Sequence, residues 1–262
     1  MKNNWFEIEE ITSGIYAIYD YEYSTNYLIN GRKKSLLIDS GWGLSNIKEF
    51  AMQYTNKPIM LVNTHGHPDH VGGNSDFSEF YISKYDIDIL KKCYSIKNKK
   101  WAIEKAIREF PENFSKDEWL EKKFNKIIPI DDGYKFDLGD RNIEVISIPG
   151  HSNGCIALLD EVSRCLFSGD SIFDGVWLHL EESTSIVQYK ESLLKIEKIE
   201  SKFDNILPGH SNKNLNKKLL NNLISLSNDI NDKIVIGKSI KTLVGNGMKY
   251  NNNNCRIIGK VV

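Results

Sequence analysis

Cysteine is scarce in this chain of 262 residues, which has four cysteines and no Cys-x-x-Cys pair. Disulfide frameworks and thiolate zinc sites need closely spaced cysteines, so we expect free thiols in a reducing compartment. Long apolar runs are also lacking, and no segment approaches the roughly 20 apolar residues that span a bilayer. The first ten residues lack the apolar core of a signal peptide, so we expect a cytoplasmic protein.

An excess of charge of one sign is likewise lacking. The chain has 34 basic and 35 acidic residues and a net charge of -1, which gives no electrostatic case for nucleic acid or an anionic membrane as a partner. The run Gly237-Lys238-Ser239 resembles the end of a phosphate-binding loop, but Asp232 stands where that loop needs an earlier glycine. A nucleotide site of that type is therefore excluded.

Strand and helix patterns alternate along the chain and predict an α/β protein. A hydrophobic content of 40% in 262 residues can bury one large core, so we expect a single domain over residues 1–262. Charged helical patterns predict a helical insertion at about 84–125, and two late strands predict a short C-terminal β extension at about 233–262. Strands are expected at 14–19, 26–29, 35–38, 59–62, 143–148, 155–159, 165–167 and 205–207, and helices at 44–53, 186–199 and 215–227.

Three of the six histidines fall in the run His65-Gly66-His67-Pro68-Asp69-His70, directly after the apolar run at 59–62. Glycine permits unusual backbone angles, and proline suits the first turn of a helix. The run therefore predicts a metal site whose ligands come from a strand end and the following turn.

Ligand-type side chains also follow three later strands. His151 and His210 each come after an apolar strand and a Pro-Gly turn, and Asp170 follows another strand. The complete set offers seven nitrogen or carboxylate donors, which is too many for one ion and suits two ions with a bridging carboxylate. These donors favour zinc, although iron and manganese take the same ones. The seven are His65, His67, Asp69, His70, His151, Asp170 and His210.

The order of these seven residues resembles the metallo-β-lactamase superfamily over about residues 13–210. The resemblance implies a four-layer αββα sandwich of two mixed β-sheets with outer helices and a metal pair at one edge. It assigns His65, His67 and His151 to the first metal and Asp69, His70 and His210 to the second, with Asp170 bridging them. An aspartate at the bridging position is similar to glyoxalase II and the acyl-homoserine lactonases, so antibiotic degradation is not expected.

Residues 149–159 and 166–175 resemble a branch of the superfamily that includes an acyl-CoA thioesterase. The implied function is hydrolysis of a small-molecule ester, thioester or lactone by a hydroxide that bridges two metal ions, with Asp69 as catalytic base. The chain departs from that branch at Trp177-Leu178-His179, where a small apolar residue and an acid are common. Phe173, Trp177 and His179 are the candidate substrate-binding residues.

Two other functions remain open from the sequence. Relatives with similar ligands bind iron, so an iron-dependent oxidase or persulfide dioxygenase is one alternative, and a non-catalytic metal-binding protein is the other. Metal content, oxygen uptake and the effect of Asp69→Asn would separate them. The expected partner is a small acyl substrate, with no nucleic acid and no membrane, and the helices at 84–125 could form a lid or the surface of a homodimer.

Overall fold

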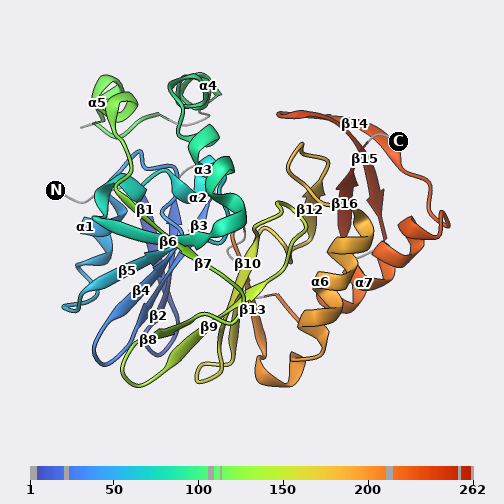
Figure 1. The fold of residues 1–262 in the computed structure, drawn as a ribbon, viewed down its shortest axis with the longest axis horizontal. Helices are drawn as coiled ribbons and strands as arrows, with labels where there is room; N and C mark the ends of the chain where they lie inside the picture. The colour runs from blue at the N-terminus through green and yellow to red at the C-terminus, as the bar shows by residue number, and fades with distance from the viewer. Residues whose placement is uncertain are drawn as a thin grey trace. The chain divides into compact units, whose positions relative to one another are not determined.

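The computed structural model describes residues 5–20, 24–105, 109–112, 114–210, 215–252 and 255–260. The chain divides into two units, Met1–Ile143 and Glu144–Val262, each described by itself below (Figure 1). Among the described residues, no helix combines the length and apolar character that a membrane-spanning segment needs.

The N-terminal unit is built on a seven-stranded sheet with the order β1-β2-β3-β4-β5-β6-β7. The pairs from β1 to β4 are antiparallel, and those from β4 to β7 are parallel. The strands are β1 (Phe6–Thr12), β2 (Ile15–Asp20), β3 (Thr25–Asn30), β4 (Ser35–Ile38), β5 (Ile59–Val62), β6 (Glu79–Ser83), β7 (Lys126–Ile130) and the separate β8 (Lys135–Asp137).

Helices connect the parallel strands of this unit. Helix α1 (Ile47–Ala51) begins at Asn46, whose side chain accepts a hydrogen bond from the Glu49 amide. Helix α2 (Pro68–Val71) follows β5, and α3 (Ile87–Cys93), α4 (Ile96–Lys105) and α5 (Lys116–Glu121) lie between β6 and β7. The expected helical character of 84–125 is confirmed, and α5 is capped by the Ser115 side chain, which accepts a hydrogen bond from the Glu118 amide. That these helices are an insertion remains a prediction.

The core of the N-terminal unit explains why β4 and β5 read as continuous apolar runs. Strands in the parallel part of a sheet are covered on both faces, so successive residues are all apolar. Leu37 and Leu61 are fully buried and belong to the same apolar cluster as Phe50 of α1 and Phe80 of β6. The buried ends of these central strands are where the predicted ligands begin.

The C-terminal unit contains two groups of neighbouring strands and two long helices. In the first group β13, β11, β10 and β9 are successive neighbours, and in the second the order is β12-β16-β15-β14. Helices α6 and α7 pack against each other, and α7 also packs on β15 and β16. The bounds are β9 (Asn142–Ser147), β10 (Ile156–Asp160), β11 (Cys165–Gly169), β12 (Gly175–Leu178), α6 (Ile186–Glu197), β13 (Asn205–Pro208), α7 (Lys218–Asn231), β14 (Lys238–Thr242), β15 (Gly245–Asn251) and β16 (Arg256–Gly259).

Candidate metal centre

The histidine run follows β5 and enters the one-turn helix α2. Pro68 stands at the first position of this helix, as predicted, and His67 is its extended N-cap residue. The reason for Gly66 differs from the expectation, because its backbone angle is not among the positive ones. A Cβ at Gly66 would lie 2.8 Å from the Leu90 amide nitrogen and 2.9 Å from the Asp86 carbonyl oxygen, so glycine is needed for the close approach of α3.

Four predicted ligands gather in the N-terminal unit, and we call His65, His67, Asp69 and His70 the N-terminal cluster. One ligand atom of His65 lies within 4.8 Å of one of His67 and of one of His70. Asp69 Oδ2 is 3.6 Å from His70 Nε2. His65 and His70 are fully buried, whereas the Asp69 side chain is 18% exposed. The run therefore forms a convergent set of donors with the carboxylate on its open side.

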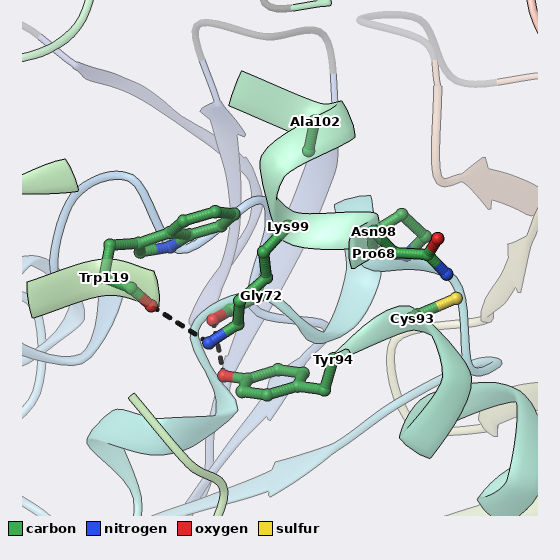
Figure 2. Close-up of a pocket in the computed structure, with 8 residues that line it drawn as sticks. All are labelled: Pro68, Gly72, Cys93, Tyr94, Asn98, Lys99, Ala102 and Trp119. Atoms are coloured by element: carbon green, nitrogen blue, oxygen red, sulfur yellow. Dashed lines mark hydrogen bonds between the residues drawn. The ribbon is translucent and has the colours of Figure 1, made fainter. Parts of the chain in front are cut away.

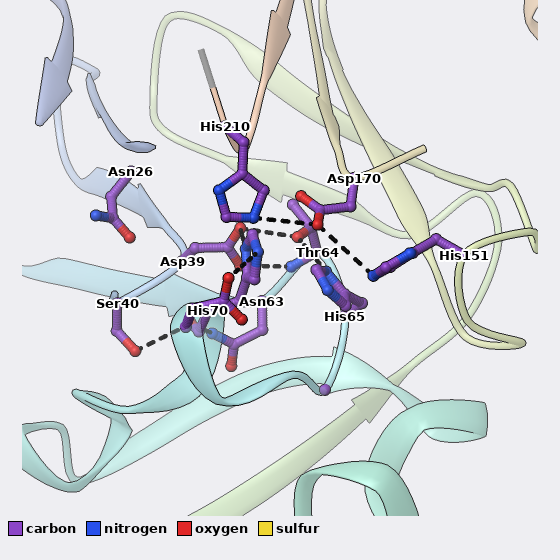
Figure 3. Close-up of polar contacts among 12 residues, drawn as sticks. Asn26, Asp39, Ser40, Asn63, Thr64, His65, His70, His151, Asp170 and His210 are labelled. Atoms are coloured by element: carbon purple, nitrogen blue, oxygen red, sulfur yellow. Dashed lines mark hydrogen bonds and ion pairs between the residues drawn. The ribbon is translucent and has the colours of Figure 1, made fainter. Parts of the chain in front are cut away.

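Asp39 is the residue of this cluster that sequence reasoning missed. It directly follows β4, and its buried carboxylate accepts hydrogen bonds from the Thr64 amide at 2.7 Å and from the Thr64 hydroxyl at 2.8 Å (Figure 3). The same carboxylate lies 2.8 Å from Nδ1 of His70. Its signal in the sequence is the one that found His151, namely a ligand-type residue at the end of a buried strand.

These contacts decide which ring nitrogen of two histidines carries the proton. The carboxylate of Asp39 can only accept, so His70 donates from Nδ1. The Thr64 hydroxyl gives its proton to Asp39, so at 3.1 Å it accepts from Nδ1 of His65. Both histidines therefore present Nε2 with a free electron pair, which is the form that binds a metal.

The backbone of α2 is held by the neighbouring loop. The His70 carbonyl oxygen accepts from the Ser40 amide at 2.9 Å, from the Ser40 hydroxyl at 3.1 Å and from the Asn63 side-chain amide at 2.8 Å. The Gly72 amide donates to the Gly41 carbonyl at 2.8 Å. The helix that carries Asp69 and His70 is thus fixed from outside as well as by its own hydrogen bonds.

The other three predicted ligands gather in the C-terminal unit, and we call His151, Asp170 and His210 the C-terminal cluster. Asp170 Oδ2 lies 3.6 Å from Nε2 of His151 and 3.2 Å from Nε2 of His210 (Figure 3). Asp170 and His151 are buried, and His210 is 28% exposed. The Gly209 amide donates to the Gly169 carbonyl at 2.9 Å, which joins the ends of β11 and β13 and sets Asp170 beside His210.

The tautomer of His151 is fixed in the same way. Its Nδ1 lies 2.8 Å from the Trp177 carbonyl oxygen, which can only accept, so Nδ1 carries the proton. The His151 carbonyl accepts from the Ser183 hydroxyl at 2.7 Å, which holds the turn after β9. His151 therefore directs an electron pair on Nε2 towards the carboxylate of Asp170, an arrangement that suits a shared cation.

The candidate substrate residues lie close to the C-terminal cluster. The Phe173 ring centroid is 6.3 Å from that of His210. Trp177 and His179 stack edge to face at 5.1 Å, and His179 Nε2 lies 3.0 Å from the Thr242 hydroxyl. Burial lowers the pKa of His179, partly offset by the charge of Glu182, and the neutral ring holds the turn after β14. Their role in binding substrate remains a prediction.

A small hollow beside α2 contains a buried lysine (Figure 2). Its volume is about 10 Å³, enough for about one water molecule and too small for a substrate. Lys99 Nζ donates to the carbonyls of Trp119 and Lys122 at 2.9 and 2.6 Å and lies 4.4 Å from the Tyr94 ring centroid. The Tyr94 hydroxyl donates to the Gly72 carbonyl at 2.8 Å. The helices between β6 and β7 are thereby tied to the end of α2.

The fold and these clusters define the class of protein. The chain belongs to the metallo-β-lactamase superfamily, whose family model matches residues 20–210, and it is a metal-dependent hydrolase. The solved structure of a metallo-β-lactamase from Pontibacter korlensis matches with a TM-score of 0.61 and 18% identity, covering 86% of this chain and 99% of that one. The predicted family and fold are confirmed.

Two curated relatives narrow the comparison. An acyl-coenzyme A thioesterase, MBLAC2 of Gallus gallus, is 26% identical over an alignment of 231 positions that covers 79% of this chain and 81% of that protein. A hydroxyacylglutathione hydrolase of Francisella tularensis is 38% identical over 78 residues, covering 29% of this chain and 31% of that protein. The first name describes a thioesterase and the second a hydrolase.

The donor set suits metal ions. Histidine nitrogens and carboxylate oxygens are the only donors in the two clusters, and the His and Asp groups of this chain can hold metal ions. Three imidazoles donate from Nδ1 to a carboxylate, a hydroxyl or a carbonyl, an arrangement that orients metal ligands and raises their basicity. Neither cluster contains a cysteine, and no disulfide joins the described residues.

Proposed function

We propose that this protein is a two-zinc hydrolase that cleaves small acyl thioesters. In this proposal His65, His67 and His151 would hold the first ion, Asp69, His70 and His210 would hold the second, and Asp170 would contribute to both. The observation that carries it is the fixed tautomer of His65, His70 and His151, each of which donates from Nδ1 and keeps Nε2 for a metal. The thioesterase relative supports the choice of a thioester over an ester or lactone.

Bound divalent ions supply a Lewis acid for the thioester carbonyl and lower the pKa of a coordinated water. Asp69 takes the proton from the attacking water as its oxygen bonds to the carbonyl carbon. The carbon–sulfur bond then breaks, and Asp69 returns the proton to the leaving sulfur, which gives a carboxylic acid and a thiol. The 18% exposure of Asp69 suits this role, because the carboxylate must reach both water and substrate.

The neighbours of Asp69 keep it in place during this proton transfer. Asp69 lies in the first turn of α2, where the helix N-terminus stabilises a negative charge. His70 is fixed by Asp39 and cannot turn its protonated Nδ1 towards Asp69. The carboxylate of Asp69 therefore stays on the open side of the N-terminal cluster, where it can accept a proton.

The test measures metal content and thiol release together. Protein loaded with zinc is expected to bind two ions per chain and to hydrolyse acyl-CoA or S-acyl glutathione. Asp69→Asn is expected to lower the rate about 100- to 10,000-fold, because it removes the proton acceptor. Asp88→Asn is the matched control, since that side chain is 98% exposed on α3, and its rate is expected to stay unchanged. One bound iron with oxygen uptake, or no hydrolysis of any thioester, would overturn the proposal.

A further inference from the structure

The C-terminal extension, residues 233–262, differs from the rest of the chain in charge. It contains six lysine and arginine residues and no aspartate or glutamate. Of the 34 basic residues in the whole chain, 28 therefore precede it together with all 35 acidic residues. The near-neutral net charge is therefore the sum of a basic C-terminal extension and an acidic remainder of the chain.

The extension adds three strands to β12, and the two faces of the resulting sheet differ. Val176, Leu178 and Ile257 lie in the apolar core of the unit, with Tyr250 packed against it, so this face is turned towards the helices. Residues paired across neighbouring strands share a face, and the registers place Trp177, Ile258, Lys249 and Lys238 together on the other one. Arg256, two residues before Ile258, shares that outer face.

Three cations lie on the outer face, and we call Lys238, Lys249 and Arg256 the basic face. Lys238 is paired directly with Lys249, and like charges in that position destabilise a sheet. Arg256 extends over Gly175, where an added Cβ would lie 2.7 Å from the guanidinium. Lys238 and Arg256 are exposed, and in the described part of the chain none of the three side chains forms an ion pair. Their positive charge is therefore open to a multiply charged anion.

The basic face is continuous with the C-terminal cluster. Trp177 lies in the same cross-strand row as Lys249 and Lys238. Its carbonyl oxygen accepts a hydrogen bond from Nδ1 of His151 at 2.8 Å. His179, also on this face, contacts the Trp177 ring and bonds to Thr242 of β14. The same sheet therefore carries the basic face and the Trp177 carbonyl, which orients the predicted metal ligand His151.

We propose that the basic face binds the phosphorylated nucleotide end of an acyl-CoA substrate, a site that rests on the proposed thioesterase function. Such a substrate carries its negative charges at the end remote from the thioester, so a cation cluster set apart from the metal ligands matches it. An exposed cation paired with a phosphate contributes about fivefold in affinity. The face selects the CoA part, while the metal centre acts on the acyl end.

The experiment compares an acyl-CoA with the S-acyl pantetheine of the same acid, which lacks the nucleotide. The wild-type protein is expected to prefer the acyl-CoA in kcat/KM. Replacing Lys238, Lys249 and Arg256 with Gln is expected to raise KM for the acyl-CoA about 100-fold and leave kcat and the pantetheine substrate unchanged. Lys241→Gln is the matched control, because Lys241 lies on the same strand but on the opposite face.

Titration calorimetry with CoA itself separates this inference from the proposed function. CoA binding that the triple variant loses and Lys241→Gln retains supports the basic face even if no thioester is cleaved. Equal use of the two substrates by the wild-type protein would overturn the inference while leaving the thioesterase intact. Loss of binding to anionic phospholipid vesicles in the triple variant, with CoA binding unchanged, would also overturn it and assign the face to a membrane.

Discussion

The Asp39 carboxylate lies 2.8 Å from Nδ1 of His70 and holds the imidazole by a charged hydrogen bond inside the N-terminal unit. Asp39 has a positive φ of 62°, a conformation that asparagine and aspartate adopt more readily than other side chains. The same carboxylate also accepts both Thr64 donors. One residue therefore sets the ring of His70 and, through Thr64, that of His65.

Asp39→Asn is expected to weaken metal binding about 10- to 100-fold, because it keeps the backbone conformation but removes the negative charge behind His70. Chelator competition with a chromophoric dye measures the affinity, and circular dichroism checks that the protein remains folded. An affinity equal to that of the wild-type protein would show that Asp39 serves the fold alone.

Tyr94→Phe is expected to lower the free energy of unfolding by about 1 to 2 kcal/mol, because the Gly72 carbonyl loses its donor. Urea unfolding gives the value, and zinc affinity measured on the same samples tests whether the end of α2 shifts. The matched control is Tyr85→Phe, since Tyr85 is 53% exposed at the start of the same helical segment. Equal losses in the two variants would contradict the link between Tyr94 and α2.

Lys99 gives the protein a pH-dependent contribution to stability. Burial, with the nearby charge of Lys122, lowers the pKa of Lys99 from 10.5 to about 8. Below pH 8 the lysine is protonated in both states, and the cost of burying its charge is fully present. Between pH 8 and 10.5 the unfolded chain binds the proton more tightly, so the stability that Lys99 contributes rises with pH.

Lys99→Met removes this titration. The wild-type protein is expected to gain about 1 to 2 kcal/mol relative to the variant between pH 7.5 and 9.5, as measured by urea unfolding at both values. Lys122 pairs with Asp76 at 2.9 Å. The variant keeps both residues, so any effect of pH on this ion pair cancels when the unfolding free energies of the two proteins are compared. If the difference in unfolding free energy between the two proteins were the same at both pH values, the lowered pKa of Lys99 would be contradicted.

Gly72→Ala tests the packing beneath α2. An added Cβ would lie 2.1 Å from the Trp42 carbonyl carbon and oxygen, so the loop that holds α2 must move. A loss of about 3 kcal/mol or more in the free energy of unfolding is expected from backbone displacement. Gly133→Ala is the control, since its φ of 78° is strained but no atom lies within 4 Å, and it is expected to cost about 1 kcal/mol. Similar losses at both sites would reject the steric account.

The sequence predicted the seven candidate ligands because each of their four segments follows an apolar strand, and the ends of these strands could be recognised from the apolar runs. β4 and β5 are observed with the predicted bounds, and α6 begins at the expected Ile186. The strands β1, β6, β7, β8, β12 and β14 were missed, and of these β1, β8 and β14 are largely exposed and lack an apolar run. The buried strand β12 pairs with β16, a neighbour remote in the sequence.

Asp39 and Gly66 show what a single sequence leaves out near the site itself. Asp39 follows a buried strand, as the predicted ligands do, but its place behind the histidines becomes visible only when β4 is found beside β5. Gly66 suggested an unusual backbone angle, but its reason is the approach of α3, a contact 20 residues or more away along the chain. Tertiary proximity, which local patterns do not encode, gives both residues their roles.

The support of the His70 carbonyl by Ser40 and Asn63 has a consequence for how the metal is acquired. Helix α2 has only four residues, and its internal hydrogen bonds are too few for it to persist alone. The side chains of Ser40 and Asn63 hold it by their hydrogen bonds to the His70 carbonyl. We therefore expect most of the ordering entropy of Asp69 and His70 to be lost on folding and little of it on metal binding. Metal uptake then resembles filling a rigid chelator, in which affinity depends on donor geometry and little on chain collapse.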